Sequence, residues 1–543
     1  MLLASSLNMR TNTNWEGNHL GTRCPSLIWV PFLILHLGGQ DSITAFSMED
    51  NNLWLRHLLN LVTQGSLALY VFWKSFYRIS YSILVPAMFI FLSGIIKYGE
   101  RISALKSASR DGLGNSVKFN SPQQNNDNNE SMASYALETV LHARGLFVGR
   151  TVSQLGARIG EQFIYEFQRY QREDKLKIVM MELGMMFDLL YTKAHVLRSR
   201  IAVIFRHVVQ ILILVAFVLF QPSKHGAHNT VNIAISYTLF IGAILVEVFS
   251  IISKAAILQR RKMKLMSCSM GQLNFINFSF TAKSQPPVIT KLISVCSLEK
   301  QYRKCFVKHI DASKGRIISS IFEFFSRQLV SLNIDRRLTH MLCLPFEHVI
   351  QRLHLCTDLH IRRHLGNAPT LDVIRLREEC EQLSNYMMYL LAVYPSMLPV
   401  SAAAEDLEPE FLKWLRNRGE ASKLDILGEV AAEWPDSPFE PEPEENEPFD
   451  LVQSLENVKE IWLRLLVYAA GKCHRELHAR QLSKGGELIT FVWLLMVHHG
   501  LGDVATEICL LPPNIVAERG LRAAESSWML HGTEPLYAFT QQH

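Results

Sequence analysis

Two long apolar runs lie almost next to each other between Leu53 and Lys97. Each run approaches the roughly 20 residues that a helix needs to cross about 30 Å of hydrocarbon. The short polar turn between them carries Lys74 and Arg78. Two spanning helices joined by such a turn form a membrane hairpin, and the sequence predicts one here.

A second pair of apolar runs begins at Ile201 and Val231, separated by the polar loop QPSKHGAHNT. Of the 543 residues, 48% are hydrophobic and 19% are charged, an ordinary balance for a water-soluble protein. The apolar excess is therefore local, and the remaining chain is long enough to bury a core of its own. We expect an all-α membrane protein with about four transmembrane helices in two hairpins and a large helical cytoplasmic region.

Basic residues are unevenly distributed around the four runs. The connectors inside the hairpins carry Lys74, Arg78 and Lys224. The flanks that follow the hairpins carry Lys97, Arg101, Lys106, Arg110, Lys254, Arg260, Arg261, Lys262 and Lys264. Because basic residues near the ends of spans favour the cytoplasmic side, we expect an integral membrane protein whose soluble regions are cytoplasmic.

Changes in composition divide the chain further. A stretch rich in Asn, Gln, Ser and Gly follows the first hairpin, and an acidic, proline-rich stretch precedes the C-terminal helices. Neither holds enough apolar side chains to offset the entropy of an ordered chain, so we expect linkers. The expected segments are a disordered start (1–25), a first membrane hairpin with a short preceding apolar segment (26–110), a flexible linker (111–134), a cytoplasmic helical segment (135–200), a second membrane hairpin (201–253), a cytoplasmic helical domain (254–433), an acidic linker (434–450), a C-terminal helical domain (451–512) and a tail (513–543).

Apolar residues at three-to-four spacing predict helices through most of the soluble part. Two stretches differ from this pattern. Trp29 to Leu37 is apolar but too short to span, so we expect it to lie at the interface, to re-enter the membrane or to pack on the bundle. In QLNFINFSFTAK, phenylalanines mix with polar residues, which indicates a short strand.

Cysteine use and net charge narrow the compartment and the partners. The nine cysteines lie far apart and form no C-x-x-C pair, which is typical of reduced thiols in a cytosol-like compartment. The net charge is only +5, from 55 basic and 50 acidic residues. The sequence does not show the clustered basic face that binding to nucleic acid requires. The basic clusters flank apolar runs, so we expect the lipid bilayer as a partner and no nucleic acid.

Ionisable residues inside membrane spans are costly and often functional. Glu247 lies about two thirds along the fourth apolar run, and Arg206 lies near the start of the third. A charged residue near the end of a span can extend its head group to the interface, so Glu247 most needs an explanation. Pairing with Arg206 and membership of an ion or proton path are the two interpretations.

Histidines at helical i, i+4 spacing occur twice, as His360 with His364 and as His474 with His478. Such a pair can hold zinc on one helix face, but catalytic zinc helices place glutamate directly after the first histidine. Glu476 comes one position too late. We expect surface or core histidines and no metal or cofactor, with zinc binding as the alternative.

The stretch SKGGE at residues 483–487 superficially resembles a phosphate-binding loop. The pair Gly485 and Gly486 is better explained as the cap of one helix and the opening of the next, with Glu487 favourable at the new N-terminus. The sequence contains no nucleotide-binding glycine motif and no nucleophile elbow. We therefore expect no catalytic residues and no enzyme activity.

Several longer stretches resemble a known family. PFLILHLGGQDSITAFSMEDNNLWLRHLLNLVTQGSLALYVFW and IKYGERISALKSAS resemble plant membrane proteins that carry domain of unknown function 4220. HARQLSKGGELITFVWLLMVHHGLG resembles the C-terminal domain of unknown function 594, and LSNYMMYLLAVYPSMLP and LLYTKAHVL are similar to family signatures. The resemblance implies a plant integral membrane protein without an assigned activity. Family members usually carry further apolar segments before the first motif.

Three hypotheses for function follow from these observations. The leading one is a membrane-anchored scaffold or interaction protein whose cytoplasmic helices bind protein partners, because the sequence shows an anchor, linkers and no catalytic constellation. The alternative is a transporter or channel component, motivated by Glu247, Arg206 and Pro86. With four spans such a component would need to oligomerise. A metal-dependent enzyme that uses the histidine pairs is the least favoured hypothesis.

Overall fold

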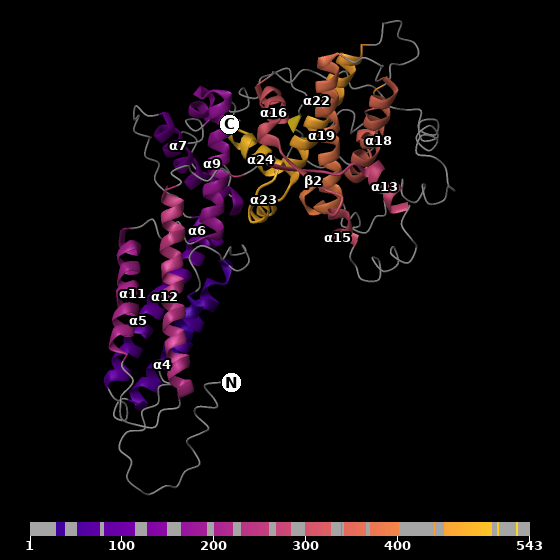
Figure 1. Ribbon diagram of the computed structural model, residues 1–543. Coiled ribbons are helices and arrows are strands. Elements are labelled where there is room, and N and C mark those ends of the chain that lie inside the picture. Colours follow the sequence, from indigo (N-terminus) through magenta and orange to yellow (C-terminus); the bar gives the residue numbers. More distant parts are fainter. Residues whose placement is uncertain are drawn as a thin grey trace, which may run out of the picture. The chain divides into compact units, whose positions relative to one another are not determined.

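The computed structural model consists mainly of α-helices (Figure 1). It describes residues 29–38, 51–75, 81–114, 128–148, 164–192, 200–220, 230–259, 266, 268–283, 299–326, 338, 341–364, 370–400, 439, 450–501, 508–509 and 528–529. The chain divides into two compact units. Unit 1 comprises Met1–Ser109 and Tyr191–Arg261, and unit 2 comprises Arg110–Leu190 and Lys262–His543.

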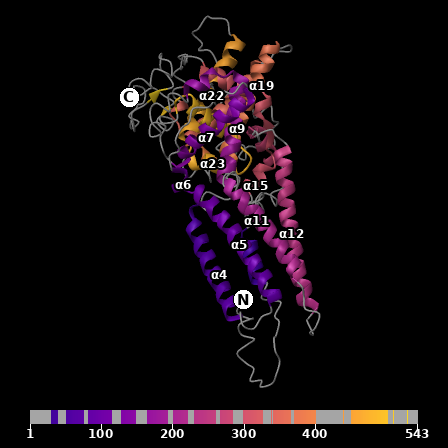
Figure 2. The same cartoon turned by 90° about the vertical axis from the view of Figure 1, so that its left-hand side faces the viewer.

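Unit 1 is a bundle of helices arranged around α5. Its elements are α2 (Trp29–Leu37), α4 (Trp54–Ser75), α5 (Tyr81–Ser107), α11 (Arg200–Leu219) and α12 (Thr230–Gln259). Helix α5 packs against α4 and α11 (Figure 2). It also packs against α2, and α12 packs against α11 and α2. The two predicted hairpins are therefore not separate, because α11 of the second packs mainly along α5 of the first.

Two helices of unit 1 are long and apolar enough to cross a membrane. They are Ile83–Ser107 within α5 and Ile233–Ile252 within α12. Helix α5 contains Pro86 and continues on both sides of it. Proline is tolerated in membrane helices where neighbouring groups satisfy the backbone. By length and composition, the described residues thus contain two candidate spans of the four that the sequence predicts.

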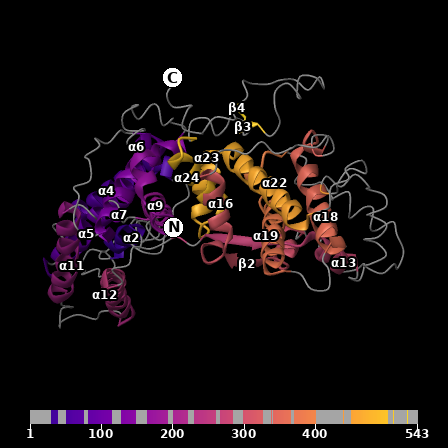
Figure 3. The same ribbon diagram turned by 90° about the horizontal axis from the view of Figure 1, so that it is seen from above.

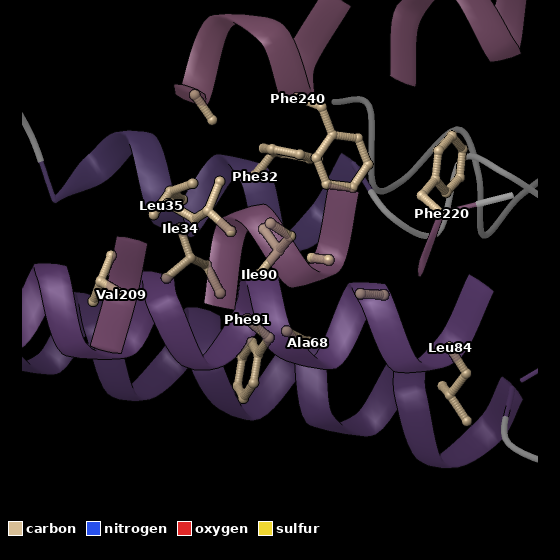
Figure 4. Close-up of a cluster of buried hydrophobic side chains, with 14 of the residues drawn as sticks. Phe32, Ile34, Leu35, Ala68, Leu84, Ile90, Phe91, Val209, Phe220 and Phe240 are labelled. Carbon is tan, nitrogen blue, oxygen red and sulfur yellow. The ribbon is translucent and has the colours of Figure 1, made fainter. Parts of the chain in front are cut away.

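The core of unit 1 is aliphatic and aromatic (Figure 4). Phe32 of α2 meets Phe240 of α12 edge-on, with 5.0 Å between the ring centres. Helix α2 also lies close against α5, where a Cβ atom added to Gly94 would be 3.0 Å from the backbone nitrogen of Leu35. Of the three placements predicted for Trp29 to Leu37, packing on the bundle is the one observed.

Unit 2 is also mostly helical. Its first elements are α6 (Arg110–Gly114), α7 (Asn128–Ala143), η2 (Arg144–Val148), α9 (Arg172–Tyr191), β1 (Ser269–Gln272), α13 (Phe275–Lys283), α15 (Glu299–Lys304), β2 (Lys308–Asp311), η4 (Ala312–Lys314) and α16 (Ile317–Ser326). The remaining ones are α18 (Phe346–His364), α19 (Leu371–Val393), η5 (Pro395–Met397), α22 (Leu451–Lys472), α23 (Arg475–Leu482), α24 (Leu488–His498), β3 (Ile508–Cys509) and β4 (Trp528–Met529).

Helix α19 is the hub of the larger part of unit 2. It packs against α18, α22 and β1, and α22 packs in turn against α24 (Figure 3). Strands β1 and β2 form an antiparallel pair in which Ser269 lies opposite Asp311 and Gln272 opposite Lys308. Strands β3 and β4 form a short parallel pair. The small strand pair β1–β2 therefore rests on α19, the same helix that packs against α22.

The predicted strand in QLNFINFSFTAK is wrong for most of its length. Strand β1 ends at Gln272, and the phenylalanines belong to helix α13. The side chain of Asn274 accepts a hydrogen bond of 2.9 Å from the backbone nitrogen of Asn277, and this cap starts the helix. A local cap therefore prevails over the mixed apolar pattern.

The predicted linkers are only partly described. Residues 111–114 continue α6 and residues 128–134 begin α7, so both ends of the first linker are helical, whereas residues 115–127 lie outside the described part. In the acidic linker, Phe439 is buried, with its ring 5.7 Å from that of His360. Residues 1–25 and most of 513–543 also lie outside the described part.

Candidate functional site

Lys97 and Glu247 form a buried ion pair in unit 1. Lys97 lies in the second half of α5 and Glu247 in the second half of α12, and both residues are less than 10% exposed. The lysine ammonium donates a hydrogen bond to Oε1 of Glu247. The carboxylate of Glu247 thus has Lys97 of α5 as an ion-pair partner, which the sequence did not suggest.

Arg206 lies beside this pair on α11. Its Nη2 donates a hydrogen bond to the hydroxyl of Ser250, one turn of α12 beyond Glu247, and it is attracted by the charge of Glu247. The structure thus brings together Arg206 and Glu247, the two ionisable residues that the sequence singled out in its apolar runs, and adds Lys97. The sequence missed Lys97 as a partner because it falls among the basic residues that flank the second apolar run.

Glu487 is the centre of a second polar cluster, in unit 2. The residue occupies the N-cap position of α24 and is only 4% exposed. Its Oε1 accepts hydrogen bonds from the hydroxyl of Tyr389 at 2.8 Å and from Nε2 of Gln481 at 3.4 Å. Its Oε2 accepts from the hydroxyl of Tyr386 at 3.3 Å. One carboxyl group therefore connects α19, α23 and α24.

The electrostatics of Glu487 are balanced between two opposing effects. Burial raises the pKa of Glu487, while the hydrogen bonds from Tyr389, Tyr386 and Gln481 and the charge of Lys484 lower it. The resulting pKa is about 7. Desolvation disfavours the charged form of a buried carboxyl, and donors stabilise it. This group can therefore gain or lose a proton near neutral pH.

Tyr389 is held in place from the other side by strand β1. A Cβ atom added to Gly271 would lie 2.5 Å from Cζ of Tyr389, so the strand backbone lies directly against the ring. The ring of Tyr389 also lies 5.7 Å from that of Tyr394, over which the ammonium of Lys484 lies at 4.4 Å. Tyr389 thus lies between the buried Glu487 and the partly exposed Tyr394.

Gly485 and Gly486 form the turn that the sequence predicts. Both have positive φ, 112° and 88°, which favours glycine. The backbone nitrogens of Lys484 and Gly485 donate to the carbonyls of Gln481 and Leu482, at the end of α23. These two N–H groups are used within the turn, which favours the helix-cap interpretation over a phosphate cradle.

His474 and His478 have different environments. His474 is exposed at the N-cap position of α23. His478 is fully buried and stacked on Trp493, and its ring nitrogens contact the hydroxyl of Thr490 and the carbonyl of Ala470. Burial lowers the pKa of His478 to about 4. The surroundings of His478 are those of a core histidine.

Glu182 and His498 form a further buried pair that the sequence did not single out. Nε2 of His498, at the end of α24, lies 2.6 Å from Oε2 of Glu182 on α9. The hydroxyl of Thr139 on α7 donates to the other carboxylate oxygen. His498 also stacks on Phe167, with 4.1 Å between the ring centres. This pair joins the early helices of unit 2 to its late ones.

One sequence signal could have pointed to the Glu487 cluster. Tyr386 and Tyr389 are three residues apart on α19 and therefore share a face, in a stretch whose other side chains are mostly apolar and buried. A buried tyrosine hydroxyl usually has a hydrogen-bond partner. The pattern thus calls for a polar partner in another element, but it does not say which.

Two further kinds of site, metal ligands and disulfides, concern the described His, Cys, Asp and Glu side chains. Within the described part of the chain, no group of three or more His, Cys, Asp or Glu side chains is placed to hold a metal ion. The cysteines that the structure describes form no disulfide; they are Cys268, Cys305, Cys343, Cys356, Cys380 and Cys473. The chemistry that the Glu487 cluster supports is proton binding.

Comparison with protein families gives two matches. A model described as "Domain of unknown function (DUF4220)" matches residues 7–304, and one described as "Protein of unknown function, DUF594" matches residues 450–501. No curated protein and no solved structure matches the chain. The first match covers more than half of the sequence and spans parts of both units. The chain belongs to the DUF4220 family and carries a DUF594 segment near its C-terminus.

Proposed function

We propose that the protein is a membrane-anchored interaction protein, in which unit 1 lies in the bilayer and unit 2 binds protein partners in the cytoplasm. The membrane anchor is supported by the distribution of exposed apolar side chains. Nearly all of the large apolar side chains that are exposed in the described residues belong to unit 1; the exceptions are Tyr165, Leu371 and Ile374. So many exposed large apolar side chains on one unit are unusual in contact with water and are expected in contact with lipid.

Helix lengths support four spans. Helices α4 and α11 have 22 and 20 residues, which at 1.5 Å per residue is at least about 30 Å of helix. The ammonium of Lys106, near the end of α5, lies 5.0 Å over the ring of Trp54 at the start of α4. These two helices are therefore antiparallel, as a membrane hairpin requires. Exposed apolar residues on α4 and α11, such as Leu59 and Ile211, extend the lipid-facing surface.

The distribution of basic residues supports the orientation. Lys97, Arg101 and Lys106 lie in the second half of α5, and Arg206 lies in the first half of the adjacent α11. The pairing of Lys97 and Arg206 with successive turns of α12 places all four at one end of the bundle. Lys74 lies at the opposite end. Basic residues favour the cytoplasmic side, so the end with four is the cytoplasmic one.

Topology can be tested with an exposed thiol of unit 2. Cys305 is exposed, and Lys74 lies at the proposed far end of the bundle. In sealed vesicles with the cytoplasmic face outward, a membrane-impermeant maleimide should label Cys305, and Cys305→Ser should lose that label. In the Cys305→Ser background, a cysteine introduced by Lys74→Cys should be labelled only after the membrane is opened. Labelling of position 74 in intact vesicles, with Cys305 protected, would reverse the orientation.

The interaction role is tested by identifying the neighbours of unit 2. A proximity-labelling enzyme fused to the C-terminus should mark a reproducible set of proteins. The control is the same enzyme on an unrelated single-span anchor in the same membrane. Two identical sets of labelled proteins would argue against specific partners.

A transporter or channel component is the second candidate, and the buried Lys97–Glu247 pair favours it. Charged groups inside a span commonly mark ion or proton paths. The test is a flux assay in reconstituted vesicles, with Glu247→Ala as the variant and the exposed Glu476→Gln as the control. No flux in the wild type, or an unchanged flux in Glu247→Ala, would rule against transport.

The metal-dependent enzyme stays a hypothesis that rests on the histidine pairs. The rings of His360 and His364 lie 4.8 Å apart on α18, so this pair does share a helix face. Nε2 of His360 already contacts the hydroxyl of Ser454 at 2.9 Å. Metal analysis of the purified protein tests this hypothesis, which does not survive if no metal is bound.

A further inference from the structure

We propose that Glu487 is a proton-controlled latch: its neutral carboxyl holds the start of α24 and the end of α23 tightly on α19, and its ionisation loosens that joint. The proposal does not depend on the membrane anchor or on any partner. It rests on the position of one buried carboxyl group at the meeting point of three helices.

The hydrogen bonds of Glu487 reach every element of the joint. Tyr386 and Tyr389 come from α19 and Gln481 from α23, while Glu487 itself begins α24. The hydroxyl of Tyr386 also accepts a hydrogen bond of 2.9 Å from the backbone nitrogen of Ile489 in the first turn of α24. A change of charge on this carboxyl therefore acts on all three helices at once.

No described ion pair compensates the charge of Glu487. The ammonium of Lys484 contributes a favourable charge, but it lies on the exposed side over Tyr394. A buried carboxylate without an adjacent cation is costly, because burial removes its hydration. The ionised form thus weakens the packed joint relative to an opened one in which water reaches the carboxylate.

The other titratable groups around the cluster are accounted for. Tyr386 and Tyr389 face Glu487 from α19, and burial raises the pKa of both hydroxyls well above the ordinary value, so they stay neutral. The buried thiol of Cys268, just before β1, also has a pKa raised well above its ordinary value by burial. His309 of β2 contacts the far side of the Tyr389 ring, at 5.7 Å between ring centres. His309 is exposed and is present in every protein compared below, so Glu487 is the buried group at this joint whose charge changes near neutral pH.

The turn between α23 and α24 is suited to such a movement. Gly485 and Gly486 have positive φ, and a Cβ atom added to Gly485 would meet nothing within 4 Å. Glycine backbones change conformation at little steric cost. Loosening at Glu487 can therefore be taken up by this turn.

Hydrogen–deuterium exchange of the full-length protein in lipid nanodiscs tests the latch. The measured quantity is the protection of amides at residues 483–490, from pH 5 to pH 8, corrected for intrinsic exchange. The variant is Glu487→Gln, which imitates the neutral carboxyl at every pH. Because buried His478 is present in both proteins, the ratio of their protection factors isolates the effect of Glu487.

The ratio has a definite expected course. The pKa of Glu487 is about 7 in the closed joint and near 4.5 in a solvated one. Protection in Glu487→Gln relative to the wild type should therefore rise about tenfold per pH unit from pH 5 and level off near pH 7. The control Glu476→Gln, an exposed carboxyl on α23, should follow the wild type. A ratio that does not change with pH overturns the latch.

A second variant keeps the test decisive if Glu487→Gln does not fold. Lys484→Gln leaves the carboxyl in place and removes the nearby positive charge, which favours the neutral form. The pH at which wild-type protection levels off should therefore move upward in Lys484→Gln. An unchanged levelling point, together with no carboxyl of the wild type protonated at pH 6 in its infrared spectrum, also overturns the proposal.

Discussion

At the scale of single residues, buried charges in the described part differ in how they are compensated. Lys97 and Glu247 neutralise each other, whereas Glu487 relies on neutral donors and on its own protonation. Removing one member of a buried pair leaves an uncompensated charge, which costs much more than replacing both members by apolar groups. The first kind of site is therefore sensitive to mutation, and the second to pH.

Lys97→Met should destabilise unit 1 by about 3–5 kcal/mol, because it leaves Glu247 buried without its cation. The double variant Lys97→Met, Glu247→Met should recover most of the loss, since both charges are gone. Thermal unfolding in a fixed detergent measures both changes. If the double variant is as unstable as the single one, the side chains contribute through packing and not through their charges.

Because His354 is buried, we expect the folded state to lose stability at acidic pH. Its Nε2 accepts a hydrogen bond from the backbone nitrogen of Phe275, and its Nδ1 lies 2.8 Å from the hydroxyl of Ser384. Burial lowers the pKa of His354 to about 4, whereas an unfolded histidine titrates near 6.5. The unfolded state thus binds more protons between these values, and stability is lost as the pH falls through them, by about 3 kcal/mol in total.

Denaturant unfolding of wild type and His354→Gln at several pH values between 4 and 7 checks this prediction. Glutamine can supply one acceptor and one donor, so the variant should fold and show a smaller slope with pH. His474→Gln is the control, because His474 is exposed and should leave the slope unchanged. Equal slopes in all three proteins would remove His354 as the cause.

At the scale of elements, the close approach of α2 to α5 depends on glycine. A Cβ atom at Gly94 would lie 3.0 Å from the nitrogen of Leu35 and 3.1 Å from Cγ2 of Ile34, whereas one at Gly99, further along the same helix, would meet nothing within 4 Å. Small residues let membrane helices pack closely through their backbones. The two glycines therefore form a matched pair for mutation.

Gly94→Ala should destabilise unit 1 by about 1–3 kcal/mol, because the backbone of α2 must move away from α5. Gly99→Ala should be neutral or stabilising by up to about 1 kcal/mol, since alanine favours a helix over glycine. Both effects are measured as shifts of the unfolding temperature under identical conditions. A loss in Gly99→Ala equal to that in Gly94→Ala would show that the contact with α2 is not responsible.

Local sequence patterns were enough to predict where most helices lie, but not which elements pack against each other. The apolar runs at residues 53–97 and 201–253 became α4, α5, α11 and α12, because helix periodicity and length are local properties. The strand prediction failed at α13, where the cap at Asn274 and the acceptor on His354 satisfy the first amides of a helix. That second partner comes from a helix 79 residues away, which no local pattern reveals.

At the scale of the whole molecule, the two units expose different surfaces. Leu245 in the middle of α12 and Leu371 at the start of α19 are both 61% exposed, one in unit 1 and the other in unit 2. The same side chain with the same exposure should contact lipid in the first case and water in the second. This comparison separates a membrane bundle from an apolar soluble one.

Leu245→Arg should oppose membrane insertion by about 2.5–3.5 kcal/mol, the cost of arginine at the centre of a span. Leu371→Arg should change stability by no more than about 0.5 kcal/mol, as expected for an exposed site in water. The fraction of protein recovered in carbonate-washed membranes measures the first effect, and denaturant unfolding the second. Full recovery of Leu245→Arg in membranes would mean that this face of α12 does not meet lipid.

The candidate sites could be predicted only in part, because the interacting residues lie far apart in the sequence. Glu247, Arg206, Gly485, Gly486 and Glu487 stood out through their type and local setting. Their partners did not, because Lys97 is 150 residues from Glu247, and Tyr389 is 98 residues from Glu487. The sequence identifies a residue that needs a partner, and only the fold supplies one.

The two residues of the buried pair Glu182 and His498 are synthesised at different times. The two residues are 316 positions apart, and the histidine lies at the end of the last helix of the DUF594 segment. At roughly 5–20 residues per second, the histidine emerges about 15–60 s after the glutamate. During that interval Glu182 and the apolar residues around it lack their final cover. This part of unit 2 can therefore be completed only after its C-terminal helices have been synthesised.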